Sequence, residues 1–343
     1  AGAPGVAVAP VSAEELDALE RWERFLNAPS KKAQLMSRYI FEHLFIGNLY
    51  FDELPGGSAW YRLVRSRTPP GEDIQIIASR RPYDDPGTET FYYRLQPRGT
   101  SVLAKRHMPY ALNDARMTRW TQLFLEPDYT VDSLPNYDGV ESANPFITFA
   151  QLPVNARYRF MLEEAHFTIM AYNKGPVCRG QVALNVIDDH FWVAFVKPNS
   201  ADPEQQADFL SAQAKRMRLP QAKGSLVVSL LQWRGYAKDQ KRYLRAEARA
   251  IANSLDHDTL RLDMTLIWDG APEQNDNAAL TVFRHFDSAT VVKGLVGQQP
   301  STMWVIDYSL LERIHYLLVA GFDVYGNVAH QLESRLYMDF LRM

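Results

Sequence analysis

The chain of 343 residues is 46% hydrophobic and 12% aromatic, a composition that predicts a folded globular protein and excludes a largely disordered one. Its 37 basic and 40 acidic side chains leave a formal net charge of −3, so we expect no nucleic-acid partner. The single cysteine excludes an internal disulfide, and no apolar run reaches the roughly 18 residues that a membrane-spanning helix requires.

The first eleven residues are small, uncharged and rich in proline and glycine, which is typical of a linker. Ser12 and Glu15 have the spacing of a capping box, which predicts a helix to about residue 26, and a second helix is expected at 30–47. Short aromatic and β-branched segments between proline and glycine turns then predict antiparallel strands at 60–67, 74–80 and 90–95.

Hydrophobic periodicity favours further helices and strands in the rest of the chain. The helices are expected at 112–126, 155–172, 205–216, 241–254, 309–320 and 329–343, and the strands at 260–267 and 279–286. Because the strands cluster instead of alternating with helices, the sequence predicts an α+β class, a helix-rich mixed fold with a small antiparallel sheet. We expect residues 12–343 to form one core domain that is truncated at its C-terminus.

The densest group of reactive side chains follows the turn at Gly175 and Pro176 and contains Cys178, Arg179, Asp189 and His190. A thiolate favoured by the neighbouring guanidinium could act as a nucleophile, with the imidazole as its base and an aspartate orienting the ring. A packed, inert thiol is the alternative, and free cysteines are more often of that kind. We expect the segment to run from the turn into a helix lined with polar side chains.

Two further groups of basic and polar side chains are candidates for contact with a substrate. Arg106 and His107 belong to a basic cluster, and Arg284 and His285 lie beside apolar surface near the end of a predicted strand. We assign Arg106, Arg284 and His285 to substrate binding and His107 to the catalytic group. A solvated loop face is the alternative for the basic cluster.

Glutamate and histidine occur three residues apart in two predicted helices, as Glu163 with His166 and as Glu312 with His315. This spacing places both side chains on one helix face, and two such pairs with two further glutamates form the ligand set of a di-iron carboxylate site. Glu42 and Glu333 are candidates for the remaining ligands. Ordinary hydrogen bonding explains the pairs more simply, so a di-iron oxidoreductase is the less favoured alternative.

Several long stretches of the sequence, taken together, resemble the fatty acid cis/trans isomerase family of Gram-negative bacteria. They cover nearly the whole chain and include RYIFEHLFIGNLYF (38–51), RRPYDDPG (80–87), GPVCRGQVALNVIDDHFWV (175–193), NAALTVFRHFDSATVVKGLVG (277–297) and DYSLLERIHYLLVAGFDVYGNVAHQLESRLYMDFLRM (307–343). Matches of this length are far more specific than any single motif described above.

The resemblance implies a periplasmic enzyme of the stress response that converts cis double bonds in the fatty acyl chains of membrane lipids into trans double bonds. It implies a covalently attached c-type haem (haem c), whose iron withdraws electron density from the double bond so that rotation becomes possible. It also implies a membrane phospholipid or a fatty acid as the substrate, and a peripheral contact with the membrane.

One departure from the family pattern concerns the haem. Its attachment motif, Cys-x-x-Cys-His, is absent from this chain, in which Cys178 is followed by arginine, glycine and glutamine. We therefore expect the haem on an N-terminal cytochrome-like module that precedes the linker at 1–11 and is missing here. The main alternative to an isomerase is a lipid-binding or docking module without chemistry of its own.

Overall fold

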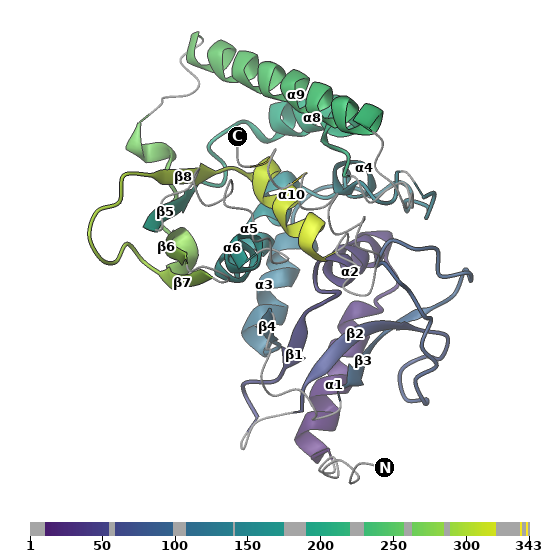
Figure 1. Ribbon diagram of the computed structural model, residues 1–343. Coiled ribbons are helices and arrows are strands. Elements are labelled where there is room, and N and C mark those ends of the chain that lie inside the picture. Colours follow the sequence, from purple (N-terminus) through teal and green to yellow (C-terminus); the bar gives the residue numbers. More distant parts are fainter. Residues whose placement is uncertain are drawn as a thin grey trace. The chain divides into compact units, whose positions relative to one another are not determined.

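The computed structural model describes residues 11–54, 59–98, 108–139, 141–174, 190–219, 230–256, 263–284, 289–319, 337 and 341. These residues form helices and two four-stranded sheets, which confirms the predicted α+β class (Figure 1). Contacts within the chain divide it into two compact units, Ala1–Gly139 and Val140–Met343. The expected linker at 1–11 and the single core domain after it stay predictions.

The described helices of the first unit are α1 (Ala13–Leu26), α2 (Lys31–His43) and α3 (Asp114–Phe124). Serine caps fix the starts of the first two. The Ser12 hydroxyl accepts a hydrogen bond from the backbone N–H of Glu15 at 3.1 Å, and Ser30 caps α2 in the same way. The rings of Trp22 in α1 and Trp120 in α3 meet edge-on with centroids 5.4 Å apart. The helices predicted for this part of the chain are thereby confirmed.

The first unit contains sheet A, formed by β1 (Asn48–Tyr50), β2 (Tyr61–Ser66), β3 (Tyr92–Pro97) and β4 (Pro109–Ala111) in the order β3-β2-β1-β4. The first three strands are antiparallel neighbours, and β4 returns to pair parallel with β1. The sheet is therefore mixed. The strand predicted at 74–80 is wrong, since Ile76 forms only an isolated bridge with Ser66, on the edge of β2 opposite β3.

The second unit holds the helices α4 (Pro145–Thr148), α5 (Val154–Leu162), α6 (Ala165–Lys174), α8 (Pro203–Gln213), α9 (Leu230–Asp256) and α10 (Tyr308–Val319), with the short 3-10 turns η1 (Ala214–Met217), η3 (Met264–Leu266) and η4 (Asp276–Ala278). The single helix predicted at 155–172 is wrong, since α5 ends before Glu163 and α6 starts at Ala165. The strand predicted at 260–267 is also wrong in its described part, where Asp263 caps the turn η3. The helix predicted at 329–343 lies outside the described residues except at positions 337 and 341, which are helical.

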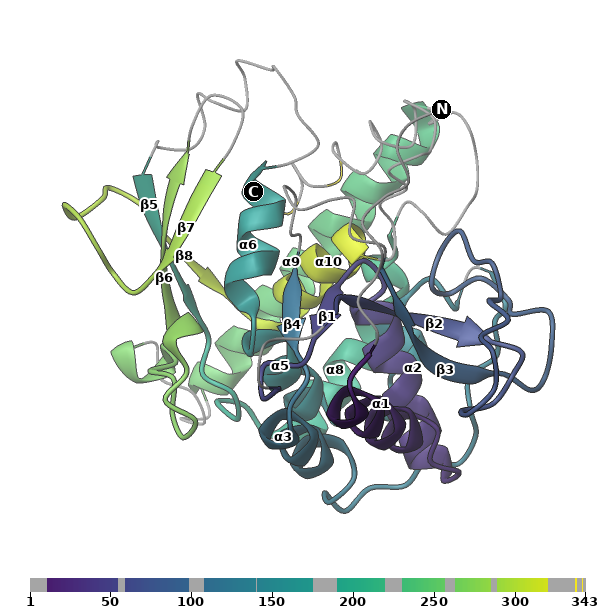
Figure 2. The same ribbon diagram turned by 90° about the horizontal axis from the view of Figure 1, so that it is seen from below.

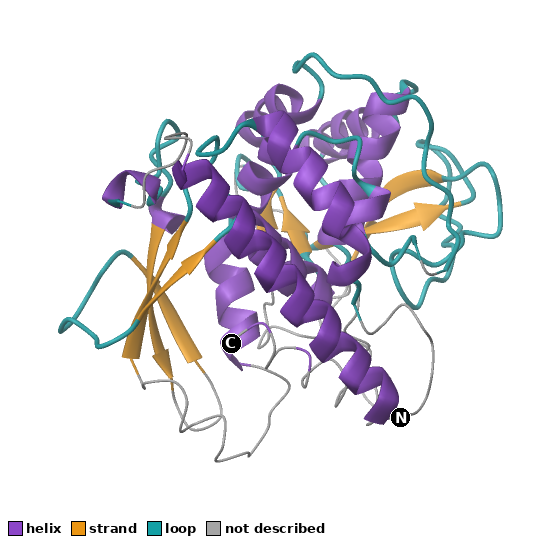
Figure 3. Cartoon of the chain, turned by 90° about the horizontal axis from the view of Figure 1, so that it is seen from above, coloured by secondary structure: helices purple, strands orange, loops and turns teal. Residues whose placement is uncertain are grey.

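Sheet B of the second unit consists of β5 (His190–Phe195), β6 (Ala279–Arg284), β7 (Ala289–Lys293) and β8 (Met303–Ile306) in the order β7-β6-β5-β8. β8 pairs parallel with β5, and the other pairs are antiparallel. Helix α6 covers one side of the sheet, where the Tyr172 and Trp304 rings lie 6.3 Å apart (Figures 2 and 3). Residues 190–193, expected in a polar-lined helix, form a strand instead, because Phe191 and Val193, both fully buried, alternate onto the inner face that α6 covers.

Candidate functional site

The face of sheet B turned away from α6 carries a surface of mainly apolar side chains. In neighbouring strands, directly opposed residues project to the same face, and the alternation of burial in the first part of β5 and in β8 agrees with the strand register. The outer face, as we call this surface, consists of the side chains of His190, Trp192, Ala194, Ala279, Thr281, Phe283, Thr290, Val292, Met303 and Val305.

Large aliphatic side chains of the outer face are exposed to solvent. Val305 is 48%, Met303 40% and Val292 37% exposed, and the loop after β7 adds Leu295 at 49% and Val296 at 37%. Scattered exposed apolar residues are ordinary, but five on one sheet face and its loop form a patch of the kind that binds apolar ligands or other surfaces. The outer face is therefore the candidate functional site.

One corner of this surface carries an imidazole that packs on an aromatic ring. His190 is directly opposed to Phe283 in the β5–β6 pair, and their rings stack with centroids 4.7 Å apart and planes 5° from parallel. The Nε2 atom of His190 is shielded from solvent and has no hydrogen-bond partner among the described residues, and the same holds for Nε1 of Trp192. Shielded polar atoms without partners are costly, so the two nitrogens mark a place where a bound group would be stabilised.

The loop after β7 folds back over this corner. The Thr281 hydroxyl donates a hydrogen bond to the Gly294 carbonyl at 2.7 Å and accepts one from the Val296 backbone N–H at 2.9 Å. Gly297 then lies beside the imidazole, where a Cβ atom would come within 3.7 Å of Cε1 of His190. Its φ of +82° favours glycine, so the turn brings backbone, and no side chain, against the ring.

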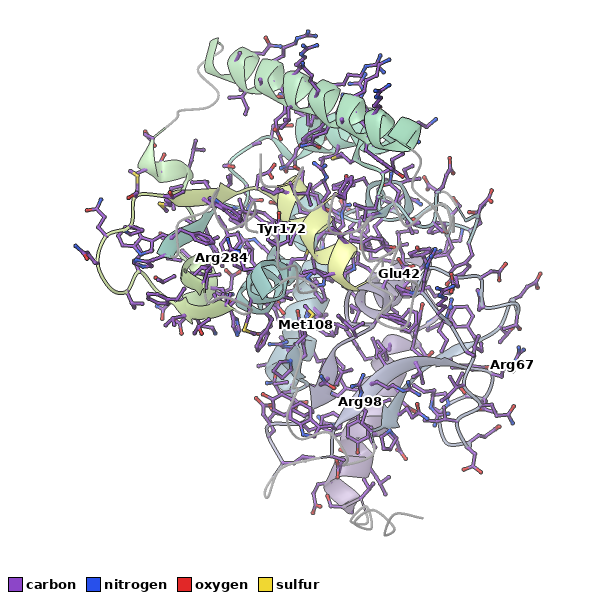
Figure 4. The ribbon with its side chains drawn as sticks, viewed as in Figure 1. Glu42, Arg67, Arg98, Met108, Tyr172 and Arg284 are labelled. Atoms are coloured by element: carbon purple, nitrogen blue, oxygen red, sulfur yellow. The ribbon has the colours of Figure 1, made fainter. Side chains whose placement is uncertain are left out.

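The structure describes two of the eight residues predicted for the site. Arg284 ends β6 (Figure 4) and His190 opens β5. Strand pairing therefore brings two separately predicted segments to the same end of sheet B. Alternation along β6 puts Arg284 on the inner face, so its side chain and that of His190 do not share one surface. The other six, Cys178, Arg179, Asp189, His107, Arg106 and His285, lie outside the described residues.

The apolar residues of the outer face were not predicted from the sequence. Trp192 lies in a continuous apolar run, FWVAF, in which no alternation marks one face as exposed. Met303 and Val305 belong to the equally apolar run MWVI. The short lengths of these runs are the signal that could have marked them as strands, but only the register reveals which side chains share a surface.

Comparison with known proteins now decides the family. A family model described as fatty acid cis/trans isomerase (CTI) matches residues 1–343. The chain belongs to the fatty acid cis/trans isomerase family. It is therefore an enzyme of that class, and the family predicted from the sequence is confirmed. No curated protein and no solved structure was found to match it.

The paired glutamates and histidines of this isomerase serve packing within the second unit. Glu163 and His166 do not share a helix, and Nδ1 of His166 lies 2.8 Å from Oδ1 of Asn277. Glu312 and His315 do share α10, but both are fully buried. Tyr308 donates to Glu312 at 3.0 Å, and Thr168 lies 2.8 Å from Nδ1 of His315. Among the described residues no three histidine, cysteine or acidic side chains are grouped as a metal site would require.

A covalently bound haem c does not fit the residues of this isomerase. The attachment needs two cysteines and a histidine in one short motif, and the chain has one cysteine. Of the described histidines, His43 and His315 are fully buried.

Among the described helices, none is both long enough and apolar enough to span a bilayer.

Proposed function

We propose that this isomerase converts cis double bonds in the acyl chains of membrane lipids into trans double bonds, and that the acyl chain lies along the outer face of sheet B. The observation that carries the proposal is the exposed apolar surface of Val292, Met303 and Val305 with one aromatic-stacked imidazole at its corner. An acyl chain offers a long apolar surface and a single polarisable double bond. The outer face offers the matching arrangement.

Binding follows from the burial of apolar area. Each methylene group of a ligand that leaves water contributes about 0.8 kcal/mol, so the affinity for the chain depends on how many of its groups this surface covers. The loop that begins at Gly294 has its own exposed aliphatic side chains, Leu295 and Val296, which can cover the ligand from the other side. The acyl chain is then held between sheet and loop with little water around the double bond.

Rotation about the double bond requires its π bond to weaken. As the π bond weakens, partial charge develops on the carbon atoms of the double bond. His190 is the residue of the outer face suited to stabilise that charge, because its Nε2 atom is shielded from water and without a partner in the described part of the chain. Polar groups that are fixed in place in a water-poor site stabilise developing charge strongly. The stacking on Phe283 holds the imidazole in one orientation.

The periplasm as the location and haem c as the cofactor rest on the family resemblance, and both belong to the proposal. Because residues 1–343 lack the attachment motif, we place the haem on other residues. What these residues contribute themselves is the binding of the acyl chain, the exclusion of water and the positioning of His190.

Conversion of a defined lipid tests the function. The protein, prepared with its haem-carrying segment and checked by the haem absorbance band, is incubated with vesicles of a palmitoleoyl phospholipid. Gas chromatography of the fatty acid methyl esters should then show the trans isomer accumulating. Saturable binding of a fluorescent fatty acid without any conversion by the haem-loaded protein would overturn the proposal in favour of a binding module.

A further inference from the structure

Helix α9 has an inner face that is firmly held within the second unit. The Tyr243 hydroxyl donates to Oε1 of Glu247 at 2.5 Å and lies 2.7 Å from the hydroxyl of Ser309 in α10. Arg313 of α10 donates to Gln240 at 2.5 Å. These contacts fix which side of α9 is turned away from the rest of the unit.

The side of α9 turned away carries a row of positive charge, which we call the cationic row. It consists of Arg234, Lys238, Lys241, Arg242, Arg245 and Arg249, all of them exposed. At 100° and 1.5 Å per residue, the six side chains fall within an arc of roughly 100° and extend over about 22 Å of helix. Figure 4 shows side chains with nitrogen ends along this side of the helix.

No acidic side chain described on α9 balances this row. Asp239 pairs with Arg218 at 3.0 Å, and Glu247 is held by Tyr243 on the inner face. Neighbouring cations on one helix face repel each other, since their spacing is shorter than the Debye length of about 8 Å at physiological salt. A net charge of −3 for the whole chain makes this concentration of positive charge a local feature that an anionic partner would stabilise.

An apolar flank borders the cationic row. Leu244 is 41% and Ile251 39% exposed, and the exposed Ala248 lies between them on the same side of the helix. A helix with a cationic face beside exposed aliphatic side chains suits the boundary between the headgroups and acyl chains of a bilayer. Nucleic acid would use the charges but leave the aliphatic flank in water.

We propose that α9 is the surface with which this protein docks on an anionic phospholipid bilayer, lying along the membrane with the cationic row on the phosphates and Leu244 and Ile251 between the headgroups. The inference rests on the proposed function in so far as the bilayer is the source of the acyl substrate. It adds the element that makes the contact.

Sedimentation with vesicles tests the proposal without any need for activity. The purified protein is mixed with vesicles of phosphatidylcholine alone or of phosphatidylcholine with phosphatidylglycerol. The variant Lys241→Glu/Arg245→Glu/Arg249→Glu reverses three charges of the cationic row. The control Arg24→Glu/Arg67→Glu/Lys197→Glu makes the same change of charge at exposed positions elsewhere.

Wild type and control should bind the anionic vesicles, more weakly as salt rises, and the α9 variant should bind roughly a hundredfold less tightly. Equal binding of all three proteins, or binding to duplex DNA with none to the anionic vesicles, would overturn the docking surface. Conversion of a detergent-dispersed fatty acid reports separately on the proposed function. Its absence in the wild type, with vesicle binding intact, would count against the enzyme chemistry and leave the docking surface standing.

Discussion

The two sheets of this isomerase share one topology and differ in what they expose. In each, three antiparallel strands follow one another and the fourth strand returns to pair parallel with the first, giving the orders β3-β2-β1-β4 and β7-β6-β5-β8. Among the described elements, α1 and α2 precede β1 and α3 follows β4, whereas α4, α5 and α6 precede β5, α8 and α9 are inserted between β5 and β6, and α10 follows β8.

The centre of sheet A is buried on both faces. Along β2, consecutive residues from Leu63 to Ser66 are buried, which places side chains of both faces out of contact with water. In β8 the exposed Met303 and Val305 alternate with less exposed neighbours. The topology therefore does not require an exposed apolar face. Sheet B has an exposed apolar face, whereas the corresponding side chains at the centre of sheet A are buried. This difference supports a binding role for the outer face.

The largest expected effect concerns the buried charges of the first unit. Glu23 of α1 receives a hydrogen bond from Arg94 of β3 at 2.7 Å and one from the backbone N–H of Leu95 at 2.9 Å. Both charged side chains are buried, so Glu23→Ala leaves the guanidinium without its counter-ion. We expect the free energy of unfolding of the first unit to fall by about 3–5 kcal/mol in urea titrations.

An exposed ion pair of the same helix provides the control. Asp17 lies 3.2 Å from Arg21, and their side chains are 70% and 39% exposed. Asp17→Ala should cost less than about 1 kcal/mol. Similar losses for the two variants would mean that the pair of Glu23 and Arg94 is not a principal support of sheet A.

In the second unit, the imidazole of the outer face should affect rate and not folding. His190→Phe keeps a ring to stack on Phe283 but removes both nitrogens. We expect kcat for isomerisation to fall by roughly a hundredfold with an unchanged KM and melting temperature. Trp192→Phe removes the other shielded nitrogen and should change kcat by no more than about twofold. A rise in KM, or a fall in stability, comparable to the fall in kcat would assign His190 a packing role.

The fourth strand of each sheet offers a direct test of the comparison. Met303→Ser/Val305→Ser in β8 removes exposed apolar groups, so the stability should change by less than about 1 kcal/mol while the affinity for a fluorescent fatty acid falls roughly tenfold. Tyr110→Ser in β4 empties a fully packed position and should destabilise the first unit by about 3–5 kcal/mol. If the β8 variant unfolds as readily as the β4 variant, the outer face is structural.

Local sequence signals were enough to predict much of the fold. Most of the candidate site, in contrast, is formed by pairing between segments that are far apart in the sequence. Ser12 and Ser30 marked the helix starts, because a capping hydrogen bond joins residues only three apart. Strands of three residues such as β1 are too short for a periodic pattern, and they were missed. The start of α9 was also missed, since Gly235 costs about 1 kcal/mol in a helix interior and interrupts the pattern before Lys241.

His190 was a candidate from its polar neighbours in the sequence. Its stacking partner Phe283 comes from a strand far along the chain, and no local pattern pairs the two. The exposure of Met303 and Val305 depends on which face α6 covers, which is a property of the tertiary packing. The sequence thus indicated one segment of the candidate site, but not which side chains of the other strands complete it.

The last contrast concerns how the two units hold an acid that is shielded in whole or in part from water. Glu23 has Arg94 as its counter-ion, whereas Glu247 in α9 lies beside the Tyr243 hydroxyl in a part of the unit that also contains Asp307. Burial, and then the charge of Asp307, raise the pKa of Glu247 from 4.5 to about 7. The folded protein therefore binds more protons than the unfolded chain between these two values, and its stability decreases as the pH rises through that window.

Glu247→Gln isolates this contribution, because the amide keeps a carbonyl oxygen to accept from Tyr243 but carries no charge. Near pH 5 the carboxyl is neutral in the folded protein and the variant should melt with the wild type. Near pH 8 the wild type carries a charge there and the variant should melt several degrees higher. Thermal melts across this range measure the difference, with Glu204→Gln at an exposed position of α8 as the control. A constant difference at all pH values would show that α9 is held on α10 without a titrating acid, as the charge-paired helices of the first unit are.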